Sequence, residues 1–115
     1  MKTDGMSVLG EVEQLVLLAI LRLGDGAYAA PIREELKERV GIELSRGSIY
    51  VTLDRLERKG YVSSWFDDPT PEPGGKARRC FKLERQGLDA LKAAQRMIAH
   101  LQAGTVLAPG SGRKS

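Results

Sequence analysis

The sequence has 115 residues, a length that predicts a single domain with a modest hydrophobic core. Its net charge of +3 and its pI near 9.2 are compatible with a nucleic-acid partner but do not by themselves indicate one. The single cysteine and single histidine exclude an internal disulfide and a Cys/His zinc site, so we expect no metal, no cofactor and a reducing, cytoplasmic location.

Residues 1–8 show no periodic pattern and are expected to form a flexible N-terminal arm. Residues 10–23 are predicted to form a helix that is apolar around nearly its whole circumference, so a second layer such as another protomer should cover part of it. Its longest apolar run, residues 15–21, is far below the roughly 20 residues that a membrane-spanning helix needs. Glu11 and Glu13 precede this run and disfavour a secretory signal, so we expect no membrane partner.

A second helix is predicted over residues 31–40, because Pro31 suits the first helical position. Ile32, Leu36 and Val40 give this helix a narrow apolar stripe, and charged residues cover the rest of its surface. It is therefore interpreted as a scaffold helix. The short connector over residues 41–44 leads into the next helix in helix-turn-helix fashion.

Residues 45–60 carry the clearest helix signals of the chain. Ser45 is the predicted N-cap, and the residues on either side of the first turn, Leu44 and Ile49, can form a hydrophobic staple. Gly60 can adopt the left-handed conformation that ends a helix. An apolar stripe faces the domain core: Ile49, Leu53 and Leu56.

The opposite side of this helix must then face outward and is mixed in charge. A step of about 100° per residue places Gly47, Ser48, Val51, Asp54, Arg55 and Arg58 on the outward side, Tyr50 and Glu57 on one flank, and Thr52 and Lys59 on the other. Two interpretations fit these residues equally well: a DNA recognition helix and an ordinary solvated helix surface.

The segment after Gly60 favours one of these interpretations. Strands are predicted over residues 61–66 and 77–83, joined by a proline-rich loop. In the second strand, Phe81 and Leu83 are expected on one face, with Arg78, Cys80 and Lys82 on the other. With Lys76 and Arg79, this is a basic hairpin. A recognition-type helix followed by a basic hairpin favours nucleic-acid binding, since the helix fits the major groove and the hairpin can reach adjacent phosphates.

The last predicted helix starts at residue 84 or 85 and ends at residue 103. Its apolar residues recur every three or four positions, a seam suited to packing on another helix. The fold class is therefore mainly α with a small β-hairpin, a winged helix-turn-helix. We divide the chain into an arm (1–8), a DNA-binding domain (9–83), a C-terminal dimerisation helix (84–103) and a disordered tail (104–115).

The chain resembles the PadR family of bacterial winged-helix transcriptional regulators over about residues 9–97. The resemblance rests on residues 9–17 (LGEVEQLVL), 47–53 (GSIYVTL), Leu56-Glu57, Gly60-Tyr61-Val62, and 78–83 (RRCFKL) followed by Gly87. It implies a homodimer formed by the last helix together with the helix over residues 10–23. The expected interface residues are Leu15, Leu18, Leu88, Leu91, Ala94, Ile98 and Leu101.

We thus expect a homodimeric DNA-binding transcriptional regulator, a repressor in the family's usual mode, on a palindromic operator in double-stranded DNA. Ser48, Val51 and Arg55 are predicted to read bases. The remaining predicted DNA-binding residues, which mainly contact the backbone, are Ser45, Arg46, Tyr50, Thr52, Arg58, Lys59, Lys76, Arg78 and Arg79. A small-molecule effector at the dimer interface is left open.

The sequence also leaves open an alternative function and alternative roles for single residues. A winged-helix module that binds protein without binding DNA is the alternative function, and an enzyme is excluded because no catalytic group or metal cluster can be assembled. Cys80 is either a redox sensor or a passive substitution, and Trp65 either stacks on a ligand or packs. Tyr50 either binds a phosphate or bridges helices, and His100 is interpreted as a surface residue.

Overall fold

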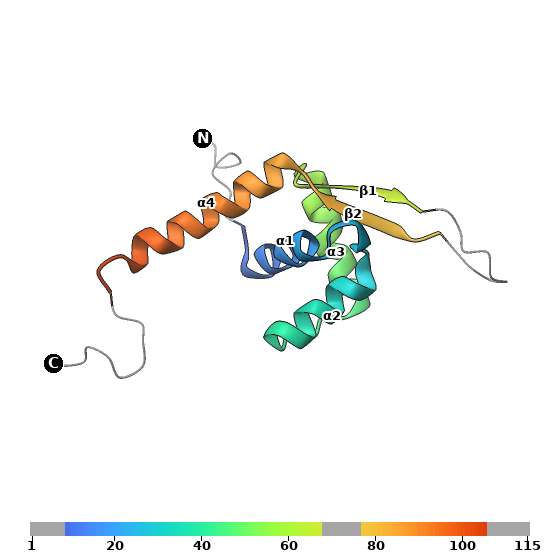
Figure 1. The fold of residues 1–115 in the computed structure, drawn as a ribbon, viewed down its shortest axis with the longest axis horizontal. Coiled ribbons are helices and arrows are strands. Elements are labelled where there is room, and N and C mark those ends of the chain that lie inside the picture. The colour runs from blue at the N-terminus through green and yellow to red at the C-terminus, as the bar shows by residue number, and fades with distance from the viewer. Residues whose placement is uncertain (1–8, 68–76, 106–115) are drawn as a thin grey trace.

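The computed structural model describes residues 9–67 and 77–105. Its elements follow the chain as α1 (Glu11–Leu23), a 3-10 turn η1 (Gly24–Gly26), α2 (Ala29–Val40), α3 (Arg46–Arg58), β1 (Val62–Phe66), β2 (Arg79–Leu83) and α4 (Arg85–Gln102) (Figure 1). This order confirms the mainly helical fold with one antiparallel hairpin. The expected arm, Lys76 and most of the expected tail lie outside the described residues.

The hydrophobic core forms around α1. Its residues Val16, Leu17 and Ile20 are almost fully buried. They belong to one cluster with buried side chains from α2, α3 and the hairpin: Ile32, Leu36, Ile49, Leu53, Leu56, Val62 and Phe81. Burial of each such side chain stabilises the fold by about 1.5–3 kcal/mol. Because Ile49, Leu53 and Leu56 of α3 belong to this cluster, α1 is the central support of α3. The predicted all-round covering of α1 is partial within one chain, because Leu21 is 51% exposed.

Both ends of α3 are defined by the local chemistry that the sequence predicts. The Ser45 hydroxyl oxygen accepts a hydrogen bond from the Ser48 N–H at 3.0 Å, and Ile49 of the staple is fully buried. At the other end the Tyr61 N–H donates to the Leu56 carbonyl and the Gly60 N–H to the Glu57 carbonyl. With Gly60 at a φ of +81°, this is a Schellman motif. Both predicted helix ends are confirmed.

The earlier start of α2 and the burial of Cys80 in β2, neither of which was predicted, have one shared reason. Residues Ala27 and Tyr28 form a short extended segment along the free edge of β2: the Phe81 N–H donates to the Ala27 carbonyl at 2.8 Å, and Tyr28 pairs with Cys80. Consequently α2 starts directly after Tyr28, two residues before the predicted Pro31. Cys80, predicted on the same strand face as Arg78 and Lys82, is only 3% exposed, and its thiol donates to the Asp67 carboxylate.

Helix α4 packs on the body with its first half only. Leu91 and Ala94 are buried against the chain's own core, and Gly87 lies so close to Tyr61, the residue before β1, that an added Cβ would collide with the Tyr61 carbonyl oxygen. The second half extends away from the body on the side opposite the hairpin (Figure 1). Leu91 and Ala94 were predicted as dimer contacts, and this placement corrects that prediction because their surfaces are already covered. Among the described helices, none is both long and apolar enough for a bilayer crossing.

Candidate nucleic-acid interface

The outward row of α3 is accessible to solvent. Ser48, Arg55 and Arg58 are exposed, and Val51 keeps 56% of its surface accessible. An apolar side chain of this size on an otherwise polar face suits contact with a thymine methyl group. The predicted base-reading residues therefore lie together on one face, free of the domain core.

Ser48 is prepared to donate a hydrogen bond from this face. Its hydroxyl oxygen accepts the hydroxyl proton of Ser45 at 3.0 Å, so its own proton can be donated outward. Thr52 differs, because it is only 7% exposed and its hydroxyl donates to the Ser48 carbonyl one turn earlier. The prediction that Thr52 contacts the DNA backbone is corrected by this burial.

Lys59 is also engaged inside the chain. Its Nζ lies 3.0 Å from Oε2 of Glu13 on α1, and both side chains are largely buried. Burial alone would raise the pKa of Glu13. The hydrogen bond from the Gly10 N–H and the nearby charges of Lys59 and Arg55 outweigh burial and hold this pKa below its ordinary value. Lys59 therefore ties the end of α3 to α1, which corrects its predicted role as a phosphate contact.

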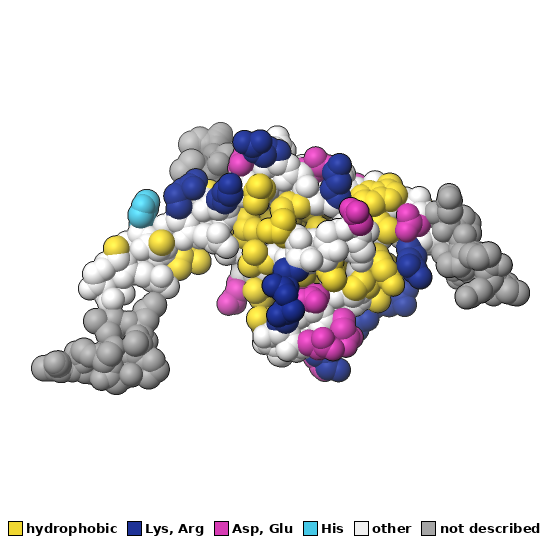
Figure 2. Space-filling model, in the orientation of Figure 1, with side chains coloured by type: hydrophobic (Ala, Val, Ile, Leu, Met, Phe, Trp, Pro, Cys, Tyr) yellow, Lys and Arg dark blue, Asp and Glu magenta, His cyan; other side chains and the backbone are white. Residues whose placement is uncertain are grey.

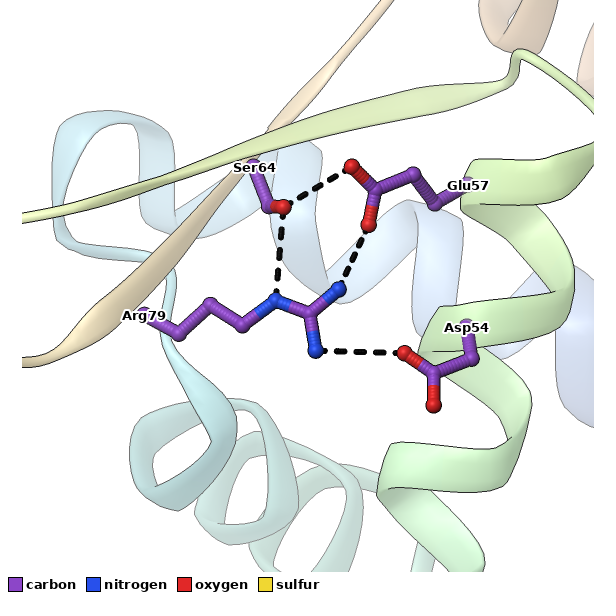
Figure 3. Close-up of polar contacts among 4 residues, drawn as sticks. All are labelled: Asp54, Glu57, Ser64 and Arg79. Carbon is purple, nitrogen blue, oxygen red and sulfur yellow. Dashed lines mark hydrogen bonds and ion pairs between the residues drawn. The ribbon is translucent and has the colours of Figure 1, made fainter.

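Arg79 is the third predicted contact that the fold uses internally. Its guanidinium reaches from β2 to α3, where Nη1 lies 3.1 Å from Asp54 Oδ1 and Nη2 lies 2.6 Å from Glu57 Oε1 (Figure 3). Its Nε donates to the Ser64 hydroxyl of β1 at 3.3 Å. The mixed charge of α3 is thus balanced by a residue of the hairpin, which sequence analysis did not predict.

A basic cleft of about 290 Å³ opens beside the start of α3. It is lined by Arg33 of α2, Arg46 of α3 and Arg78, which precedes β2 at the loop end of the hairpin, together with Tyr28, Ala29, Ala30, Tyr50, Ala77 and Arg79. The Arg78 guanidinium stacks 4.6 Å from the centre of the Tyr28 ring, and Arg33 is held by its bond to the Leu44 carbonyl. Among the residues that the structure describes, no carboxylate lines this cleft, so its described lining suits an anion. Arg33 and Tyr28 were not predicted as binding residues, since both precede the recognition helix.

The half-buried Leu15 and Leu18 of α1 border a small apolar hollow of about 150 Å³ between α1 and α2. Ile98 and Leu101 on the free half of α4 are 47% and 85% exposed, and Leu88 is half-buried. Figure 2 shows hydrophobic side chains gathered where α4 meets the body and again along its far half.

The other candidate residues are Cys80, His100 and Trp65, and their surroundings bear on the roles considered for them. Burial and the Asp67 carboxylate raise the pKa of the Cys80 thiol, although the charge of Arg78 acts in the opposite direction. A raised pKa disfavours the reactive thiolate, so the passive interpretation of Cys80 is favoured. His100 is exposed, and Trp65 is 41% exposed. Within residues 9–67 and 77–105, no three potential metal ligands lie close enough to hold an ion.

Comparison with known proteins gives one family. A model described as the transcriptional regulator PadR-like family matches residues 17–93. A solved PadR family transcription regulator from Clostridium difficile R20291 is 25% identical, with a TM-score of 0.66 over 82% of this chain and 96% of that chain.

Two other solved structures are similar. A PadR family regulator from Eggerthella lenta DSM 2243 is 25% identical, with a TM-score of 0.64 over 82% of this chain and 81% of that one. A transcriptional regulator from Clostridium thermocellum shares the fold at 18% identity, with a TM-score of 0.67 over 80% of this chain and 86% of that chain. No curated protein sequence matches significantly.

Proposed function

Because the chain belongs to the PadR-like family of transcriptional regulators, we propose that it represses transcription by binding a palindromic operator as a homodimer. The family consists of regulators rather than enzymes. The observation that carries the proposal is the exposed row on α3, flanked by a cleft whose described lining contains arginines and no carboxylate. The family's site of action is DNA, so a cytoplasmic location in a bacterial cell is part of the same proposal.

In this proposal α3 enters the major groove and its outward row reads the bases. Arg55 donates to guanine acceptors, Val51 contacts a thymine methyl group and Ser48 bonds a base edge. Backbone contacts come from residues that the fold leaves accessible at this face and in the cleft: Ser45, Arg46, Tyr50, Arg58 and Arg78, with Arg33 added. Tyr50 borders the cleft, which favours phosphate binding over a role between helices.

The homodimer is supported by the unequal covering of α4. A second copy would bury the exposed Ile98 and Leu101 together with the accessible parts of Leu15, Leu18 and Leu88. Two copies related by a two-fold axis would present their α3 helices to half-sites roughly 34–36 Å apart. An operator with inverted symmetry follows from that arrangement.

Selection of binding sites from random duplex DNA by the purified protein tests the proposal. We expect a palindrome, and we expect Val51→Ala and Arg55→Ala each to relax preference at one position per half-site, at a cost of about 1–3 kcal/mol. Arg85→Ala on the exposed start of α4 is the matched control and should select the same palindrome. Absence of any enriched sequence, with no duplex affinity in moderate salt, would favour a protein-binding module instead.

A further inference from the structure

The side chain of Arg79 forms a three-way link between the hairpin and α3. Ser64 of β1 accepts a hydrogen bond from its Nε and in turn donates to Glu57 Oε2 at 2.8 Å. The two Nη atoms reach Asp54 and Glu57, one turn apart on α3 (Figure 3). The guanidinium also stacks 5.0 Å from the centre of the Phe81 ring. Nε and both Nη atoms of this group therefore each have a partner in the same chain.

This link also changes the electrostatics of the DNA-facing surface. Asp54 lies on the outward side of α3 beside Arg55 and Arg58, and its side chain is 47% exposed. Unpaired carboxylates at this place would repel phosphates. Arg79 is only 27% exposed, so its attraction to Asp54 and Glu57 is less screened than that of a surface ion pair.

We propose that Arg79 is a positioning residue: it fastens the hairpin to the recognition helix and masks the charge of Asp54 and Glu57, and it does not bind phosphate. To reach a phosphate, its guanidinium would have to leave two carboxylates and a hydroxyl; Asp54 would then face the DNA unpaired, and Glu57 would keep only its hydrogen bond from Ser64. The fastening of the hairpin is a property of the free protein, whereas the masking of the two carboxylates rests on the proposed DNA-binding function. Arg78, its neighbour in the chain, is the matched comparison because it is exposed and lines the cleft.

The first experiment uses the free protein and needs no DNA. Arg79→Gln should accelerate amide hydrogen exchange in β1 and β2 by at least about tenfold and shift the emission of Trp65, which lies on β1. Arg78→Gln should change neither. Glu57→Gln weakens the same link from the helix side and should act in the same direction, so the test does not depend on the folding of one variant. Unchanged exchange and emission in both Arg79→Gln and Glu57→Gln would overturn the fastening role.

The second experiment measures affinity for a mixed-sequence duplex by fluorescence anisotropy between about 50 and 200 mM salt. Arg78→Gln should lower the steepness of log K against log salt by about 0.9, the value for one lost phosphate contact. Arg79→Gln should weaken binding without lowering that steepness, and adding Asp54→Asn and Glu57→Gln should restore the affinity.

A loss of steepness in Arg79→Gln equal to that in Arg78→Gln would show a phosphate contact and overturn the proposal. If the wild-type protein bound no duplex at all, the DNA-binding function would be refuted. The hydrogen-exchange result would still decide whether Arg79 fastens the hairpin.

Discussion

Glu13 joins two separate parts of the fold, so its replacement offers a graded test of the energetics. Its Oε1 accepts the Gly10 N–H at the start of α1 at 2.9 Å, and its Oε2 lies 3.0 Å from Lys59 Nζ at the end of α3. Glu13→Ala removes both interactions. Glu13→Gln keeps a neutral acceptor for Gly10 and removes only the charge that pairs with Lys59.

The geometry sets the size of the two effects. Loss of the bond at the helix start costs about 1 kcal/mol, and loss of a hydrogen bond to a charged group in a partly buried place costs about 1.5–3 kcal/mol. We therefore expect Glu13→Ala to lower the free energy of unfolding by roughly 3 kcal/mol and Glu13→Gln by about half of that. At about 4–8 °C per kcal/mol, the alanine variant should melt more than about 10 °C below the wild type.

The pKa of Glu13 determines the direction in which its contribution to stability changes with pH. The folded-state pKa of Glu13 lies below its ordinary value of 4.5, so the charged form is favoured by folding. Its contribution is fully present above pH 4.5 and is lost as the pH falls through the lower folded-state pKa. The difference in stability between the wild type and Glu13→Gln should thus shrink below pH 4.5.

Thermal unfolding followed by circular dichroism, in buffers from about pH 7 down to about pH 3, measures all three proteins. The reasoning is refuted if the difference between the wild type and Glu13→Gln is the same at every pH. It is also refuted if Glu13→Ala melts together with Glu13→Gln, because the bond to Gly10 would then contribute nothing.

Three further outcomes are expected. Gly87→Ala should destabilise the fold by about 1–3 kcal/mol or more, seen as a lower midpoint in urea, since its Cβ would collide with the Tyr61 carbonyl oxygen; an unchanged midpoint would contradict the close packing of α4. Leu101→Asp should shift the protein to monomers in sedimentation analysis while leaving the circular dichroism spectrum unchanged, and a persisting dimer would place the interface elsewhere. Cys80 should react slowly with iodoacetamide in the native protein and fast in denaturant, because burial and the Asp67 carboxylate raise its pKa; rapid native alkylation would revive the redox interpretation.

Local signals were sufficient to predict α3 from the sequence. The cap at Ser45, the predicted Leu44–Ile49 staple and Gly60 all act within a few residues. The structure contains the cap and the left-handed Gly60, and Leu44 packs against the core cluster to which Ile49 belongs. The outward row followed from the helical period and the inward stripe, so its exposure at Val51 was also predictable. Periodicity is strongest where one face of an element is buried and the other is not.

The internal partners of the basic residues could not be predicted in the same way. Lys59 pairs with a carboxylate 46 residues earlier, and Arg79 with one 22 residues earlier, distances over which a single sequence carries no pairing signal. The burial of Cys80 could not be predicted for a similar reason, since the extended segment at Tyr28 that borders β2 is too short to show a strand pattern. Asp54 on the outward side and Glu57 on the flank of a recognition helix were the one available hint that a cation lies nearby.

The two halves of α4 have a consequence for how such a regulator would respond to its own abundance. Leu91 and Ala94 complete the core of a single subunit, while Ile98 and Leu101 lie beyond it, so a subunit can fold before it meets a second copy. Assembly is then a separate equilibrium between folded species. With the homodimer as the form that binds DNA, operator occupancy at low expression would rise with the square of the subunit concentration, and a modest change in synthesis or turnover would switch the target gene over a narrow range.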